Sequence, residues 1–144
     1  MVKRIAINGF GRIGRLVLRT ALERSDLEVV AINDLVPPDN LAYLFKYDTV
    51  HRTYPKEVKS DAGHLIIGGK KIFVSAEKDP TRLPWKENKV DYVVESTGRF
   101  THMEDAKQHL RAGAKRVLIS APGKDDMPTY VVGVNHTRYN PQKD

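Results

Sequence analysis

The chain has 144 residues and a net charge of +6 at pH 7; 40% of its residues are hydrophobic and 29% are charged. This composition is typical of a folded globular domain and argues against an intrinsically disordered chain. The absence of cysteine excludes disulfides and thiolate metal sites, and no apolar stretch is long enough to span a membrane. Because no secretory signal precedes the first expected strand, we expect one cytoplasmic domain covering residues 1–144.

The excess positive charge allows two interpretations. It could indicate binding to a specific nucleic acid, or a solvated basic surface that attracts phosphorylated ligands. The basic residues are scattered and are not interleaved with aromatic residues as in an RNA-binding motif. We therefore favour the second interpretation, since basic patches often bind polyanions without specificity, and we expect neither a specific nucleic acid nor a membrane as partner.

The first motif of the chain is a glycine-rich turn between an expected strand and an expected helix. Residues 4–8 alternate in polarity and are rich in β-branched side chains, which predicts a buried strand. After Gly11 the apolar residues recur at helical spacing. In this context the glycines have separate roles: Gly9 allows a tight turn, Gly11 lets a diphosphate approach the backbone, and Gly14 lets the helix pack closely on the strand.

A second strand is expected at residues 28–33, and it ends at Asp34. This carboxylate lies about 20 residues after Gly14, the spacing expected of an acid that binds the adenosine ribose of a dinucleotide. It would repel a 2′-phosphate, and residues 35–38 supply no arginine to bind one. The pattern predicts NAD rather than NADP, and a tightly packed β-α-β turn without a ligand is the alternative.

The rest of the chain is expected to continue the alternation of strands and helices. Gly68-Gly69 stands between two apolar runs, which predicts a β-hairpin that interrupts the alternation of strands and helices. The predicted fold is α/β: a Rossmann-type, doubly wound, mainly parallel sheet with an antiparallel β insertion. The expected elements are a helix of about two turns marked by Leu41, Leu44 and Phe45 and ending near residue 47; antiparallel strands at 57–59, 64–67 and 71–74; a strand at 90–95; a helix from 101 to 112; and strands at 116–120 and 130–134.

Some polar residues in these elements are candidates for function. The small residues 96–98 follow a strand and suit a ligand crevice, although a simple strand-to-loop turn is an equal alternative. Thr101 and Glu104 match a capping box. His51 could be a catalytic base or ligand, but a surface or structural histidine is the simpler interpretation, and we interpret His102 and His109 as exposed.

Together these motifs resemble the amino-terminal, NAD-binding half of the glyceraldehyde-3-phosphate dehydrogenase family, and the resemblance covers the whole chain. It implies a parent enzyme of glycolysis, a homotetramer that oxidises glyceraldehyde 3-phosphate with inorganic phosphate and NAD to 1,3-bisphosphoglycerate. The stretches that carry the resemblance are residues 7–15, 31–34, 46–48, 96–98, 112–115 and 120–122.

The resemblance also implies roles for individual residues. The backbone of Arg12 and Ile13 would contact the diphosphate, and Asp34 would bind the adenosine ribose. Leu35 and Phe100 would lie near the adenine, with the backbone of Lys78 at the same end. Thr97 and Gly98 would border the adenosine, and Ser120 would approach the nicotinamide ribose. The complete expected set is Gly9, Phe10, Gly11, Arg12, Ile13, Asp34, Leu35, Lys78, Thr97, Gly98, Phe100 and Ser120, with no metal ligand among them.

The sequence departs from the family pattern at three points. Arg52 stands where the family often has glycine, and Gly123 stands where it often has serine. The larger departure is the missing nucleophilic cysteine, because aldehyde oxidation in this family proceeds through a covalent thiohemiacetal. We therefore expect a fragment without its catalytic domain, which binds NAD and is inactive alone. The alternatives are a stand-alone NAD-binding module and erythrose-4-phosphate dehydrogenase, which tends to carry glutamate in place of Asp34.

Overall fold

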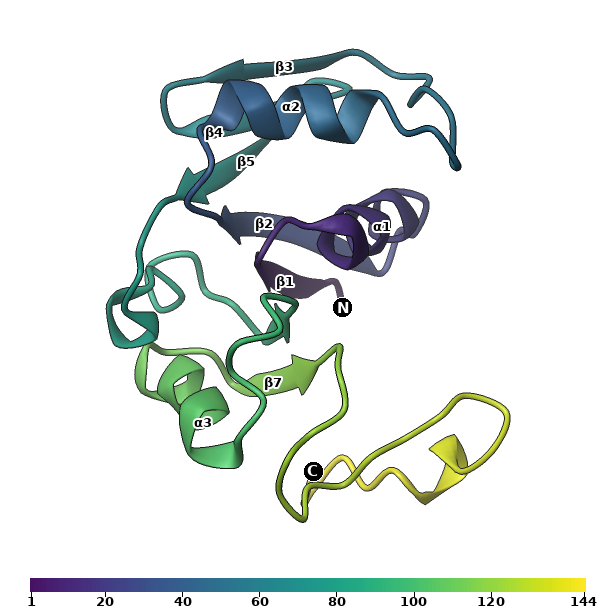
Figure 1. Cartoon of the computed structure of the whole chain (residues 1–144), viewed down its shortest axis with the longest axis vertical. Coiled ribbons are helices and arrows are strands. Elements are labelled where there is room, and N and C mark those ends of the chain that lie inside the picture. The colour runs from purple at the N-terminus through teal and green to yellow at the C-terminus, as the bar shows by residue number, and fades with distance from the viewer.

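The computed structural model describes all 144 residues and contains one seven-stranded sheet with the strand order β3-β4-β5-β2-β1-β6-β7 (Figure 1). Strands β5, β2, β1, β6 and β7 pair in parallel, whereas β3 and β4 are antiparallel. The predicted Rossmann-type α/β fold is confirmed. The elements are β1 (Lys3–Asn8), α1 (Arg12–Leu22), β2 (Leu27–Asn33), α2 (Pro38–Lys46), β3 (Val58–Asp61), β4 (His64–Ile67), β5 (Lys70–Ser75), β6 (Tyr92–Glu95), α3 (Met103–Arg111) and β7 (Arg116–Ile119), with short 3-10 helices at Pro80–Arg82 and His136–Arg138.

Strand β5 belongs to both parts of the sheet. It pairs antiparallel with β4 and, on its other edge, parallel with β2. The antiparallel addition is therefore limited to β3 and β4, while β5 completes the parallel sheet. No helix of the chain has the length and apolar character that crossing a membrane requires.

Apolar side chains fill a core on each face of the sheet, because successive strand residues point to opposite sides. Ile5 and Ile7 of β1 belong to the core that includes Leu18 of α1, whereas Ala6 belongs to the core around Trp85. A fully buried isoleucine or leucine side chain contributes about 1.5–3 kcal/mol to folding stability relative to an exposed one. These two cores fix the carboxyl ends of the central strands, where the glycine-rich turn lies.

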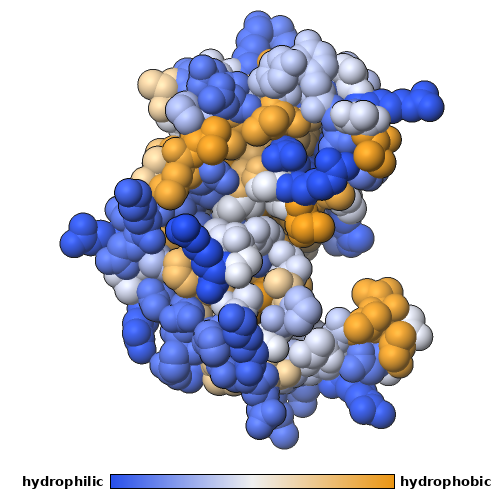
Figure 2. Space-filling view, viewed as in Figure 1, coloured by the Kyte–Doolittle hydropathy of each residue, from blue (hydrophilic) through white to orange (hydrophobic).

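The strand expected at residues 130–134 is not formed, so that prediction is wrong. These residues adopt turns and coil, and the chain beyond Ser120 extends away from the sheet (Figure 1). Val131, Val132 and Val134 are exposed, and Figure 2 shows an apolar cluster standing out on this terminal segment. A β-branched run favours a strand only where it packs on a pleated, partly buried surface, which this segment lacks here.

The capping box expected at Thr101 and Glu104 is also wrong. His102 occupies the N-cap position, and the hydroxyl of Thr101 is buried without a hydrogen-bond partner. The N–H of Met103 instead donates to the carboxylate of Asp125 over 2.7 Å. This bond, together with one from His102, lowers the pKa of Asp125, whose negative charge also suits the positive end of the helix.

Candidate functional site

The glycine-rich turn joins β1 to α1 at the carboxyl edge of the parallel sheet. Gly9 has φ of +90°, and a Cβ there would lie 2.7 Å from the backbone nitrogen of Thr97. A Cβ on Gly14 would lie 2.2 Å from the carbonyl oxygen of Gly9, whereas one on Gly11 would meet nothing within 4 Å. The tight turn at Gly9 and the close packing at Gly14 are therefore confirmed, and the backbone at Gly11 is accessible from outside.

The start of α1 offers backbone donors beside this turn. Gly11 is the N-cap and provides no side-chain hydrogen bond to the helix, and Arg12 and Ile13 in the first turn are exposed. The first N–H groups of a helix lack partners within it and carry partial positive charge. No acidic residue stands in the first turn to offset that charge, so this end of α1 is suited to an anion.

Asp34 accepts two backbone hydrogen bonds, one of them from the same turn. Its Oδ2 accepts the N–H of Phe10 at 2.7 Å, and its Oδ1 accepts the N–H of Val36 at 2.9 Å. The carboxylate is half-buried, and the neighbouring Leu35 is exposed. An oriented carboxylate with free lone pairs can accept hydrogen bonds from a pair of hydroxyl groups.

A second acid, Asp48, lies close to the start of α1. Its Oδ1 accepts the N–H groups of Val50 and His51, each at 2.8 Å, and lies 3.7 Å from the guanidinium of Arg12. The bond from His51 is the largest cause of a fall in the pKa of Asp48 to about 2, which burial opposes. His51 itself is a largely exposed histidine whose ring lies 3.4 Å from the same oxygen.

This low pKa predicts a pH dependence of stability. Because the folded-state pKa of Asp48 lies below its ordinary value of 3.8, its ionised form stabilises the fold fully above that pH. The contribution is lost as the pH falls toward about 2. We expect Asp48→Asn to flatten this part of the profile when the urea midpoint is measured against pH. An Asn variant with the wild-type slope between these pH values would contradict the assignment.

The loop after β6 forms the other side of the site. The N–H and the hydroxyl of Thr97 both donate to Oε1 of Glu95, at 3.0 and 2.5 Å. The hydroxyl of Ser120, which follows β7, donates to Ser96 at 3.0 Å. The backbone of Thr97 lies directly against Gly9, so this loop and the glycine turn pack together.

Two expected site residues lie at the margins of this arrangement. Lys78 is exposed in the loop after β5, next to Glu77, whose N–H donates to Asn33 at 2.8 Å. Phe100 is half-buried and packs edge-on against His109, with the ring centroids 6.3 Å apart. The structure therefore groups Gly9 to Ile13, Asp34 and Thr97 closely, and gives Phe100 a contact with α3.

A buried chain of polar side chains lies beneath the site, and the sequence analysis missed it. The expectation of an exposed His109 is wrong, because this residue is completely buried. Its Nδ1 accepts the indole N–H of Trp85 at 3.0 Å, and its Nε2 lies 2.5 Å from Oε2 of Glu95. The available signal was that the apolar strands β1, β2 and β6 each end in a polar residue, namely Asn8, Asn33 and Glu95.

Glu95 is the negatively charged centre of this chain. Burial raises its pKa most strongly, but hydrogen bonds from His109, Thr97 and Asn8 together outweigh burial and bring the pKa below the ordinary value of 4.5. The carboxylate is therefore ionised at neutral pH, although the residue is only 1% exposed. A buried charge of this kind is tolerated only where several donors satisfy it.

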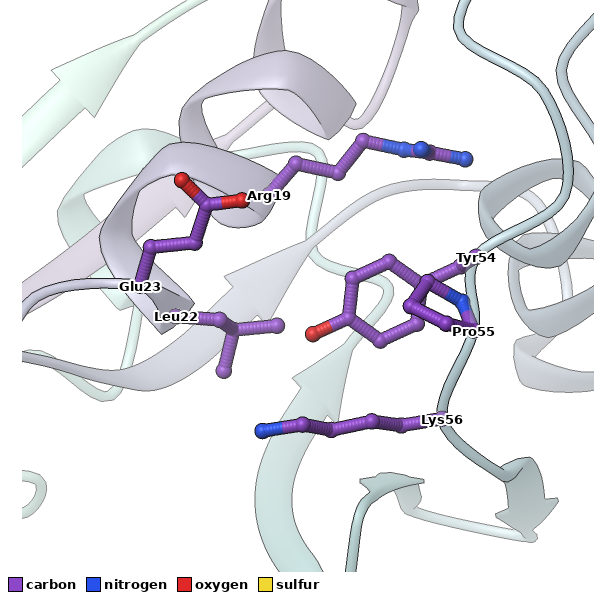
Figure 3. A pocket seen from close by; sticks show the side chains of 6 residues that line it. All are labelled: Arg19, Leu22, Glu23, Tyr54, Pro55 and Lys56. Atoms are coloured by element: carbon purple, nitrogen blue, oxygen red, sulfur yellow. The ribbon is translucent and has the colours of Figure 1, made fainter.

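A separate cavity of about 460 Å³ opens between α1 and the segment that follows α2 (Figure 3). Arg19 at its edge donates to the carbonyl groups of Phe45, His51 and Arg52 and stacks on the rings of Phe45 and Tyr54. Arg52 has φ of +65°, a left-handed conformation that glycine adopts more readily than other residues. Because the guanidinium of Arg19 is engaged within the fold, we assign this region a structural role.

The comparisons with known proteins agree with this geometry. A family model described as the NAD binding domain of glyceraldehyde 3-phosphate dehydrogenase matches residues 3–103. Curated relatives named glyceraldehyde-3-phosphate dehydrogenase include that of Chlamydia pneumoniae, 59% identical over 98% of this chain, and that of Geobacillus stearothermophilus, 54% identical over 99%. A relative from Trypanosoma brucei brucei, named as cytosolic, is 52% identical over 96%.

The chain spans 42% of the length of each of these relatives. The matched region contains the glycine-rich turn, Asp34 and the loop at Thr97, so the family model covers both sides of the site. The chain belongs to the glyceraldehyde-3-phosphate dehydrogenase family, and it corresponds to the NAD-binding domain of that family.

Proposed function

We propose that the 144 residues form one domain that binds NAD at the carboxyl edge of the sheet. The observation that carries the proposal is the bond between Asp34 and the N–H of Phe10, which holds an acid beside an accessible glycine turn. The residues fit the cofactor: the first N–H groups of α1 suit a diphosphate, and the Asp34 carboxylate suits ribose hydroxyls.

The remaining contacts follow from the positions around this centre. Arg12 and Ile13 would present backbone N–H groups to the diphosphate, and Leu35 would cover the adenine. Thr97 and Gly98 would border the adenosine, and Ser120 would approach the nicotinamide ribose. Lys78 and Phe100 would complete the adenine end, Phe100 from its place beside His109.

For the full-length protein we propose the oxidation of glyceraldehyde 3-phosphate with inorganic phosphate to 1,3-bisphosphoglycerate. Bound NAD would accept the hydride, and a nucleophilic thiolate would form the covalent intermediate. These 144 residues contain no cysteine, so the thiolate must come from residues outside them, and we expect the present chain alone to be inactive. We further propose a cytoplasmic homotetramer.

The second candidate is a non-catalytic NAD-binding module. The absence of cysteine from these 144 residues favours it, because the chain then has no thiolate nucleophile. Sequencing the source transcript beyond the codon for Asp144 separates the two. An open reading frame with an early cysteine codon supports the dehydrogenase, and a stop codon supports the module.

The role of Asp34 is tested by replacing it with alanine. We expect Asp34→Ala to weaken NAD binding by about 1–3 kcal/mol, because hydrogen bonds to a charged group are lost, while NADP binding is not weakened. Isothermal titration calorimetry with both cofactors measures this, and Asp39→Ala, which removes an exposed acid of α2, is the control. Equal affinity of the wild-type chain for NAD and NADP would contradict the role of Asp34.

A further inference from the structure

Glu95 lies under both sides of the cofactor site and accepts every hydrogen bond that reaches its side chain. Its Oε1 accepts the N–H and the hydroxyl of Thr97, at 3.0 and 2.5 Å. Its Oε2 accepts the side-chain amide of Asn8 at 2.7 Å and faces Nε2 of His109 at 2.5 Å. Four donors from three elements thus converge on one buried carboxylate.

The hydrogen bonds on both sides of Glu95 have a fixed direction. The indole of Trp85 can only donate, so Nδ1 of His109 is an acceptor and Nε2 carries the hydrogen that points to Glu95. On the other side Asn33 donates to Asn8 at 2.8 Å, which leaves the Asn8 amide to donate to Glu95. Each oxygen of the carboxylate faces two donors. Glutamine at this position would place its amide NH2 group, itself a donor, where one of these oxygens accepts hydrogen bonds.

This chain of bonds connects three loops of the site. Thr97 is held by Glu95 and lies against Gly9, so the position of the Thr97 side of the loop depends on the carboxylate as well as on the backbone bond from Ser96 to Asn8. Asn33 additionally exchanges hydrogen bonds with the backbone N–H and carbonyl of Glu77, at 2.8 and 2.9 Å, next to Lys78. The side chain of Glu95 bonds both to Thr97 and to Asn8, and the backbone joins the same two regions through the N–H of Ser96, which donates to the carbonyl of Asn8 at 2.7 Å.

We propose that Glu95 is a positioning residue of the cofactor site, which holds the Thr97–Gly98 loop and the Gly9 turn at the separation that NAD requires. The proposal rests on the proposed binding of NAD at this edge of the sheet. Glu95 acts through Thr97 and Asn8 and makes no contact with the cofactor itself. Trp85 and His109 lie on the side of Oε2, whereas Thr97 bonds only to Oε1.

The test compares Glu95→Gln with Trp85→Phe, which disturbs the buried network on the side remote from Thr97. Three quantities are measured: the urea midpoint, hydrogen exchange of the Thr97 and Gly98 amides without ligand, and the Kd for NAD. We expect Glu95→Gln to accelerate exchange of the Thr97 amide and to raise the Kd about tenfold, since bonds to a charged group are lost. Trp85→Phe should lower the urea midpoint and leave the Kd within about twofold of wild type.

A milder pair keeps the test decisive should Glu95→Gln not fold. Thr97→Val replaces the hydroxyl that donates to Glu95 and accepts the N–H of Arg99 at 3.1 Å, and Thr97→Ser restores it. We expect the valine variant to bind NAD several-fold more weakly and the serine variant to recover wild-type affinity.

Each outcome bears on one hypothesis. A wild-type chain that does not bind NAD would refute the proposed cofactor site, while the exchange data would still report whether Glu95 orders the Thr97 loop. Unchanged NAD affinity in Glu95→Gln overturns the positioning role, even with faster exchange. Equal losses of affinity in Glu95→Gln and Trp85→Phe, in proportion to lost stability, would show a purely structural residue and also overturn it.

Discussion

Replacing Gly14 by alanine is expected to lower the free energy of unfolding by about 2–3 kcal/mol or more, and to abolish NAD binding. The added Cβ would lie 2.2 Å from the carbonyl oxygen of Gly9 and 3.1 Å from a methyl group of Ile7. Because the first contact is with backbone, α1 must move away from β1, and overpacking of this kind is costly. Urea unfolding followed by circular dichroism measures the stability, and calorimetry measures the binding.

Gly11→Ala is the matched control for this prediction. A Cβ at Gly11 meets no protein atom within 4 Å, so we expect the stability to stay within about 1 kcal/mol of wild type. NAD binding should nevertheless weaken, since the new methyl group would project where a diphosphate approaches the backbone. Normal NAD binding by Gly11→Ala would place the diphosphate elsewhere, and wild-type stability of Gly14→Ala would refute the close packing.

Glu95→Leu is expected to cost about 3–5 kcal/mol of folding stability, the range seen when one partner of a buried charged network is removed. The variant leaves the donors of His109, Asn8 and Thr97 without their acceptor in a site that is almost completely buried. The urea midpoint of the purified chain measures the effect.

An exposed glutamate of the neighbouring helix provides the comparison. Glu104 of α3 pairs with Lys107 at the surface, and Glu104→Leu should leave the urea midpoint close to that of wild type. A loss below about 1 kcal/mol in Glu95→Leu would mean that the buried donors find other partners, contrary to the network described here.

The parts of the site that the sequence predicted are those specified by local spacing. The glycine turn, the helix after it and Asp34 lie within one β-α-β unit, whose period changes and turn residues are visible along the chain. The alternation that places Ile5 and Ile7 on one face and Ala6 on the other is equally local. These features needed no knowledge of how distant segments pack.

The errors concern residues whose environment is set by distant partners. His109 is buried because α3 brings it to Trp85 and to Glu95, which lie 24 and 14 positions away in the sequence. The start of α3 is bonded by Asp125 from a later loop, so the local capping pattern at Thr101 was misleading. The apolar residues 130–134 have strand propensity but no neighbouring strand in the structure.

The burial of Trp85 has a practical consequence. It is the only tryptophan of the chain, and its indole N–H is hydrogen-bonded to His109 in the network that ends at Glu95. Selective excitation of indole fluorescence therefore observes one residue, at the far end of the chain of bonds beneath the proposed cofactor site. The protein carries an intrinsic optical probe of that network, with which its order can be followed without any label.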